Sequence, residues 1–206
     1  RGQSITHDGS KWIATGEDID PSKRIQYSTD NGSTWLPFTL PTIDASANIT
    51  NIITIPSSNK MIISDDEGTT WTTNDGIFTG KTNKIHHNKA TGLWMAVGEG
   101  DTYNVATSTD GITWTGRGKV FNLKGNSVFY KHGIWVAVGE DANTLKNVAF
   151  STDDGVTWNN PTVELYNVEC NDVIYGSSRW WVCGNSTYLY WSEDGVTWNT
   201  ANKHTV

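Results

Sequence analysis

Four polar residues recur at the same place in a repeated pattern, directly after the glycine that ends an apolar run. They are Glu17, Glu99, Glu140 and Asn185. A ring of such side chains could bind a cation, a basic partner or the hydroxyl groups of a sugar. The same pattern also fits ordinary solvated turns, in which each glutamate caps local backbone and was copied with the repeat. Both interpretations are open at this level.

Aromatic side chains offer a second kind of binding surface, because a sugar ring can stack on an exposed indole or phenol. Alternation along strands favours core packing for at least half of the aromatic residues near the C-terminus. Tyr103 and Tyr188 lie in or next to loops and are the better candidates for exposure. The C-terminal aromatic cluster comprises Trp180, Trp181, Tyr188, Tyr190 and Trp191.

The many carboxylates form no pattern that selects a catalytic pair. A glycosidase needs two carboxyl groups about 5–10 Å apart, on either side of the glycosidic bond. His86 and His87 are adjacent in an expected strand, so their side chains point to opposite faces and do not easily bind one ion together. We therefore expect no catalytic residue, no metal site and no cofactor.

Charge and size restrict the class of protein. The chain has 206 residues, with 15 basic and 22 acidic side chains and a net charge of −7. This charge argues against nucleic acid or an anionic membrane surface as a partner. No apolar run approaches the ~18 residues of a membrane-spanning helix, so we expect no membrane insertion.

An internal repeat organises the whole chain. One segment, Ser-x-Asp followed by glycine and Thr-Trp, occurs five times, and its tryptophans are 36, 43, 44 and 40 residues apart. A second segment, Trp-x-Ala-x-Gly or a close variant, precedes four of the copies. The five copies are Ser28–Trp35, Ser64–Trp71, Ser108–Trp114, Ser151–Trp158 and Ser192–Trp198.

Each full unit reads as four short strands and no segment has a sustained helical period. In the fourth unit, for example, an Asn126–Tyr130 run is followed by Trp135–Gly139, by Asn147–Phe150 and by a strand starting at Thr157-Trp158. The Asp-x-Gly between the third and fourth strands is hairpin chemistry. Four-stranded units at this period are the size of propeller blades. The sequence predicts an all-β protein, a β-propeller with five blades of about four antiparallel strands.

We expect one domain over residues 1–206, with blades at about 1–48, 49–80, 81–122, 123–167 and 168–206. The second unit lacks some twelve residues, which predicts three strands or a degenerate blade between Ile49 and Asn74. Because the chain starts at Arg1, we also expect it to be a piece of a longer protein.

The five segments resemble Asp-boxes, also called bacterial neuraminidase repeats, which occur in sialidases and sortilin-type receptors. The whole pattern is also similar to repeat arrays in phage and giant-virus proteins. The resemblance implies that the box turns lie on the face of the propeller away from the ligand, with Glu17, Glu99 and Glu140 on the ligand face. It implies a structural role for the box aspartates, Asp30, Asp66, Asp110, Asp153 and Asp194, and the box tryptophans are expected to pack between blades.

The resemblance does not extend to sialidase catalysis. Sialidases bind the substrate carboxylate with three arginines and carry a Phe/Tyr-Arg-Ile-Pro motif. This chain has four arginines in all, Arg1, Arg24, Arg117 and Arg179, and none lies in that motif. We therefore expect a protein that is not an enzyme.

The favoured function is non-catalytic recognition or adhesion. We expect the module to bind glycans or a cell-surface receptor, as part of a larger extracellular or virion-surface protein. The alternative is a structural or assembly scaffold that binds protein partners. A glycosidase-like enzyme ranks third.

The two cysteines lie on neighbouring expected strands. A turn at Gly176-Ser177 would place Cys170 and Cys183 opposite each other and would allow a disulfide. A turn at Ser177-Ser178 would place them out of register.

Overall fold

The computed structural model describes residues 2–7, 12–16, 25–37, 51–54, 59–64, 72–141, 147–161, 169–185 and 189–200. The regular structure of these residues consists of β-strands. Within this part of the chain no helix is long and apolar enough to cross a membrane.

The strands form five antiparallel sheets, numbered here in chain order. Sheet one contains β1 (Gly2–His7), β2 (Trp12–Gly16), β3 (Ile25–Ser28) and β4 (Leu36–Pro37). Sheet two contains β5 (Asn51–Thr54), β6 (Met61–Ser64) and β7 (Thr72–Asn74). Sheet three contains β8 (Thr82–Asn88), β9 (Leu93–Gly98), β10 (Val105–Ser108) and β11 (Thr115–Gly116). Sheet four contains β12 (Lys124–Lys131), β13 (Ile134–Glu140) and β14 (Val148–Ser151), and sheet five contains β15 (Cys170–Gly176), β16 (Arg179–Gly184), β17 (Tyr190–Ser192) and β18 (Asn199–Thr200).

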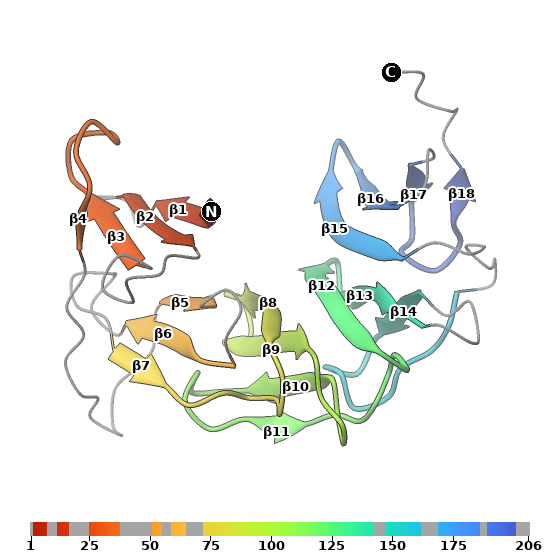
Figure 1. Cartoon of the computed structure of the whole chain (residues 1–206). Helices are drawn as coiled ribbons and strands as arrows, with labels where there is room; N and C mark the ends of the chain where they lie inside the picture. The colour runs from red at the N-terminus through yellow and green to blue at the C-terminus, as the bar shows by residue number, and fades with distance from the viewer. Residues whose placement is uncertain are drawn as a thin grey trace.

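The sheets follow one another along an arc, and sheets one and five stand on either side of its opening (Figure 1). Within each sheet the strands pair in chain order, as the repeat predicts. Sheet two has three strands, as expected for the short unit, and the Asp66 turn between β6 and β7 lies outside the described residues. Sheet four replaces its fourth strand by a single bridge between Phe150 and Asn159.

The core lies between neighbouring sheets. One cluster between sheets three and four contains Met95, Val97, Phe121, Val128 and Trp135, all fully buried. A second, between sheets four and five, contains Val136, Val138, Val173, Trp180 and Val182. Both faces of the second strand in these sheets are therefore apolar, which explains the Trp-x-Ala-x-Gly pattern.

Aromatic contacts tie the first strand of one sheet to the next sheet. His86 of β8 packs on Phe129 of β12 with 4.4 Å between ring centroids, and edge-on against Trp135 of β13 at 5.7 Å. Phe129 in turn meets Trp180 of β16 at 6.2 Å. Burial lowers the pKa of His86 to about 4, so its imidazole is neutral at pH 7.

A β-bulge near the start of the first strand supplies a polar link between sheets. The register shifts at Gln3, Asn83, Asn126 and Asn171 in β1, β8, β12 and β15. The Asn83 amide donates to the carbonyl of Gly125 in the next sheet at 2.8 Å, and Asn126 donates to the carbonyl of Cys170 at 2.9 Å. The bulge aims each of these amides out of its own sheet.

The glycine near the end of the second strand packs against the residue two positions before this bulge residue. A Cβ at Gly98, Gly139 or Gly184 would collide with the backbone carbonyl of Lys81, Lys124 or Glu169, respectively. Rings from the preceding connection press on the same site, Phe78 on Gly98 and Phe121 on Gly139. No larger residue fits without moving backbone.

The Ser-x-Asp turns share one hydrogen-bond pattern. In the two longer described copies the serine hydroxyl donates to the aspartate (Ser28 to Asp30, 2.7 Å; Ser151 to Asp153, 2.8 Å) and accepts from the glycine N–H. Hydrogen bonds from the threonine hydroxyl, the threonine N–H and the serine lower the pKa of Asp30 and Asp153 to about 2. The aspartates are therefore ionised and fully engaged in their own turns.

The two shorter copies keep the aspartate pattern but lose the tryptophan hydrogen bond. The indole N–H groups of Trp35 and Trp158 donate to the carbonyls of Gly32 and Gly155, both at 3.1 Å. Those of Trp114 and Trp198 are buried without a hydrogen-bond partner. The residue that the shorter copies lack is the one before the glycine, which has a positive φ in the longer copies, as Asp154 does.

The two cysteines are not joined by a disulfide. The turn is at Ser177 and Ser178, both with positive φ, so Cys183 pairs with Asp172 and Cys170 with Gly184 across the bulge. The disulfide that a turn at Gly176-Ser177 would allow is therefore not formed. Cys170 is buried and Cys183 is exposed.

We predict that Gly139→Ala lowers the free energy of unfolding by about 1–3 kcal/mol, because the new methyl group must displace the Lys124 carbonyl and Phe121. Chemical denaturation measures the change. Gly176→Ala is the control, since its Cβ would meet open space. Equal destabilisation by both variants would contradict the packing argument.

We also predict that Ser151→Ala lowers the free energy of unfolding by about 1–3 kcal/mol, because the buried Gly155 N–H loses its acceptor. Differential scanning calorimetry would report it as a lower Tm. Thr152→Ala changes the adjacent exposed residue and should have little effect. An unchanged Tm for Ser151→Ala would show that the turn tolerates an unsatisfied amide.

Candidate functional site

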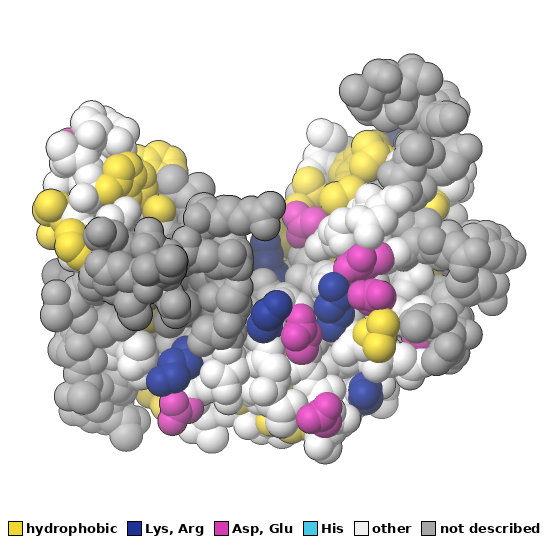
Figure 2. Space-filling view, viewed as in Figure 1, with side chains coloured by type: hydrophobic (Ala, Val, Ile, Leu, Met, Phe, Trp, Pro, Cys, Tyr) yellow, Lys and Arg dark blue, Asp and Glu magenta, His cyan; other side chains and the backbone are white. Residues whose placement is uncertain are grey.

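The candidate ligand residues that the structure describes lie at one end of the sheets. Glu99 follows β9, Glu140 ends β13 and Asn185 follows β16, so all three are at the end where the chain also enters β8, β12 and β15. Glu17 and Tyr188 lie outside the described residues. On this face acidic and basic side chains lie next to one another (Figure 2).

Lysines accompany the predicted glutamates. Lys81 Nζ is 4.0 Å from Glu99 Oε1, and Lys124 Nζ is 3.3 Å from Glu140 Oε2. An acidic ring was one of two interpretations of these residues, and the described part of this face carries both signs of charge. Its members, which we call the charged cluster, are Lys81, Glu99, Lys124, Glu140, Glu169 and Asn185.

Lys124 is the centre of the cluster. It also pairs with Glu169 of the next sheet at 2.8 Å, and about 29% of its side chain is exposed. The hydrogen bond with Glu169 raises the pKa of Lys124 and lowers that of Glu169, in both cases against the effect of burial. Glu169 further accepts from Asn185 at 2.7 Å, so this carboxylate is held from both sides.

Tyr103 is a poor stacking surface. Its side chain is half-buried, and its hydroxyl donates to the carbonyl of Ile77 at 2.9 Å. Its ring packs against Phe78, with 5.8 Å between ring centroids, and lies against Gly116. The Tyr103 side chain is therefore used in packing against sheet three.

An open cleft of about 500 Å³ adjoins the charged cluster between sheets three and four. Its walls carry cations and anions together with one exposed apolar side chain, Leu123, which is 47% exposed. Thr79 donates to Asp101 across the cleft rim at 3.1 Å. The lining residues are Thr79, Gly80, Glu99, Gly100, Asp101, Lys119, Asn122, Leu123 and Lys124.

Sequence reasoning missed the cations of this site. Arg1, Lys81, Lys124 and Glu169 each stand two positions before the bulge residue, in the register of the repeat. Three of the four are basic, and aligning the units on this bulge residue would have found them. The exception, Glu169, is the partner of Lys124.

The described residues of this face form ion pairs and line a cleft. No group of three His, Cys, Asp or Glu side chains within them is arranged to hold a metal ion. His87 stacks on Trp94 at 3.7 Å, and His86 lies between sheets three and four. The described box aspartates, Asp30, Asp110, Asp153 and Asp194, bond to their own turns.

No protein-family model and no curated protein match this chain. Solved structures do match it. YCF48 bound to D1 peptide is 18% identical, with a TM-score of 0.62, over 98% of this chain and 67% of that chain. YCF48 from Cyanidioschyzon merolae is 14% identical, with a TM-score of 0.59, over 98% of this chain and 72% of that chain.

These neighbours are β-propellers, and the likeness at such low identity concerns the fold. The chain is therefore an all-β protein of the β-propeller class, as the repeat predicted.

We predict that Lys124→Met lowers the free energy of unfolding by about 1 kcal/mol at pH 7, a small value because solvent partly screens the pair. The low pKa of Glu169 means that its contribution is present above its unfolded pKa and is lost as the pH falls through the folded one. The difference between wild type and variant should therefore shrink from pH 5 toward pH 3, roughly the range in which a carboxyl group titrates.

Urea denaturation at several pH values measures this difference. Lys89→Met is the control, because Lys89 is exposed at the opposite end of sheet three. A difference independent of pH would show that the effect of the substitution does not depend on the charge of Glu169.

Proposed function

We propose that this propeller is a non-catalytic module that binds a protein partner, with the cleft between sheets three and four as its site. The observation that carries the proposal is the juxtaposition of both charge signs, an exposed leucine and an open cleft on one face. A polypeptide can present charged, apolar and backbone groups together, which matches this lining.

The fold comparison supports the same choice. One structural neighbour is a propeller bound to a peptide. The glycan interpretation favoured by the sequence has less support, because the described stacking candidate, Tyr103, uses its hydroxyl and ring inside sheet three. Protein binding was the alternative in the sequence analysis and is now the main proposal.

We further propose that the repeated turns are Asp-boxes in the sense of the neuraminidase repeat. Four described turns share the aspartate-centred hydrogen bonds, and each of them follows the third strand of its sheet. In this proposal their role is to close hairpins, which leaves binding to the opposite face.

The experiment is a screen of the whole chain against a displayed random peptide library, beside a glycan array. We expect selected peptides to bind wild type and to lose about tenfold or more in affinity for Lys119→Glu, a charge reversal in the cleft wall. Lys89→Glu makes the same change at the other end of the sheet and should bind as wild type does.

Peptides that bind both variants equally would move the site out of the cleft. Glycan binding without peptide binding would overturn the proposal in favour of a lectin. Folded protein that selects no peptide would also contradict it.

A further inference from the structure

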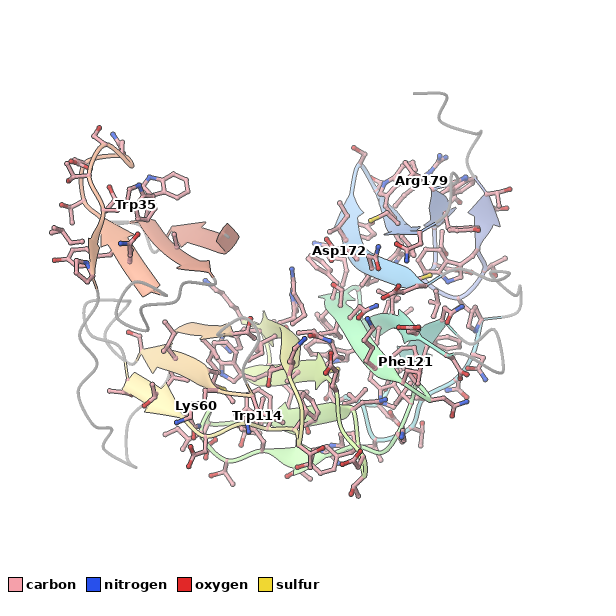
Figure 3. The ribbon with its side chains drawn as sticks, viewed as in Figure 1. Trp35, Lys60, Trp114, Phe121, Asp172 and Arg179 are labelled. Atoms are coloured by element: carbon pink, nitrogen blue, oxygen red, sulfur yellow. The ribbon has the colours of Figure 1, made fainter. Side chains whose placement is uncertain are left out.

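One face of sheet five carries a row of aromatic and apolar side chains that are exposed or half-buried. Ile174, Trp181 and Trp191 are directly opposite one another on β15, β16 and β17, so they share a face. Ile174 is 50% exposed, and the two tryptophans are half-buried. Figure 3 shows Arg179 in the same sheet, and its guanidinium lies 4.2 Å from the Trp191 ring.

The same row is covered in the two preceding sheets. In sheet three it contains His86 and Met95, and Met95 is fully buried. In sheet four it contains Phe129 and Val136, and Val136 is fully buried. The row of sheet five therefore corresponds to a surface that is part of the core elsewhere in the molecule.

In sheets three and four the row is covered by the next sheet along the chain, through the same contacts each time. The turn glycine of sheet four, Gly155, packs on Met95, and that of sheet five, Gly195, packs on Val136. The second-strand tryptophan of the next sheet meets the row from the inner side, as Trp135 meets His86 and Trp180 meets Phe129. Each interface thus has the same two apolar parts.

The polar part of the interface is also unused at sheet five. Asn83 and Asn126 each donate to a backbone carbonyl of the next sheet. Their counterpart Asn171 is exposed and donates instead to Asn185 of its own sheet, at 3.0 Å. Asn171 and the aromatic row lie at the positions that dock a following sheet in the rest of the chain.

We propose that this face of sheet five docks a further blade of the same repeat. The blade would bring a turn glycine onto Trp181, a second-strand tryptophan onto Ile174 and a backbone carbonyl to Asn171. The two solved propellers are longer than this chain, which covers 67% and 72% of them, so a propeller that includes this fold can hold more chain than is present here.

A stacking site for sugar fits the row less well. The Arg179 guanidinium occupies the Trp191 ring, and the indole N–H of Trp181 donates to the carbonyl of Gly176 at 3.2 Å. Closure by sheet one of the same chain is a competing outcome, and the experiment separates it.

The test uses thiol labelling of Ile174→Cys in a Cys183→Ser background, where Cys170 is buried and burial raises its pKa to about 12. The first protein is the whole chain. The second has residues 161–200 repeated after Thr200, which continues the repeat in register because Thr200 and Asn160 each follow their tryptophan by two residues.

We expect rapid labelling in the whole chain and labelling slower by about tenfold or more in the extended chain, because the added blade covers position 174. Cysteine at the corresponding position of the added blade is the matched control and should label rapidly. The extended chain should also have a higher Tm.

Slow labelling in the unextended monomer would show that sheet one covers the row, and would overturn the proposal. A second extended chain carries a repeat of residues 117–160 instead. Fast labelling at position 174 in both extended chains would overturn the proposal as well. The second extension guards against one added unit that fails to fold. Glycan binding that Trp181→Ala abolishes, with labelling still fast, would favour the sugar site.

Discussion

The hydrogen bond from a bulge asparagine to the next sheet is the constraint on which the rest of the structure depends. It fixes the height of one sheet against the next, because the amides of Asn83 and Asn126 must reach a single backbone carbonyl. The same pairs of sheets are joined by His86 and Phe129, which meet the tryptophans of the following sheet. The apolar contacts supply most of the stabilisation, and the asparagine supplies their register.

The charged cluster is a consequence of the same bulge. The bulge brings the residue two positions before it against the glycine near the end of the second strand, as Lys124 lies against Gly139. The next residue of the second strand then lies beside that lysine, and Glu140 is at this position. Acid and base are therefore neighbours because of backbone geometry, and the repeat copies the pair together with the fold.

The sequence predicted the strand order and the turns well because both depend on local chemistry. Serine, aspartate and glycine in Ser151–Gly155 determine a turn whatever surrounds it. The lysines beside Glu99 and Glu140 were not predicted, because the units were aligned on their turns and tryptophans and not on the bulge residue that follows each lysine by two positions. The sequence left the register of the two cysteines open between two turns, and two serines with positive φ place the turn at Ser177-Ser178.

The reversal of charge in sheet five has a structural cause. Glu169 and Asn185 stand where sheets three and four have a lysine and a glutamate. A lysine at position 169 would face Lys124, whose ammonium lies 2.8 Å from the Glu169 carboxylate. The carboxylate instead joins sheets four and five, and an amide at Asn185 can donate to it where a glutamate would repel it. The departure of this unit from the repeat thus belongs to the contact between sheets four and five.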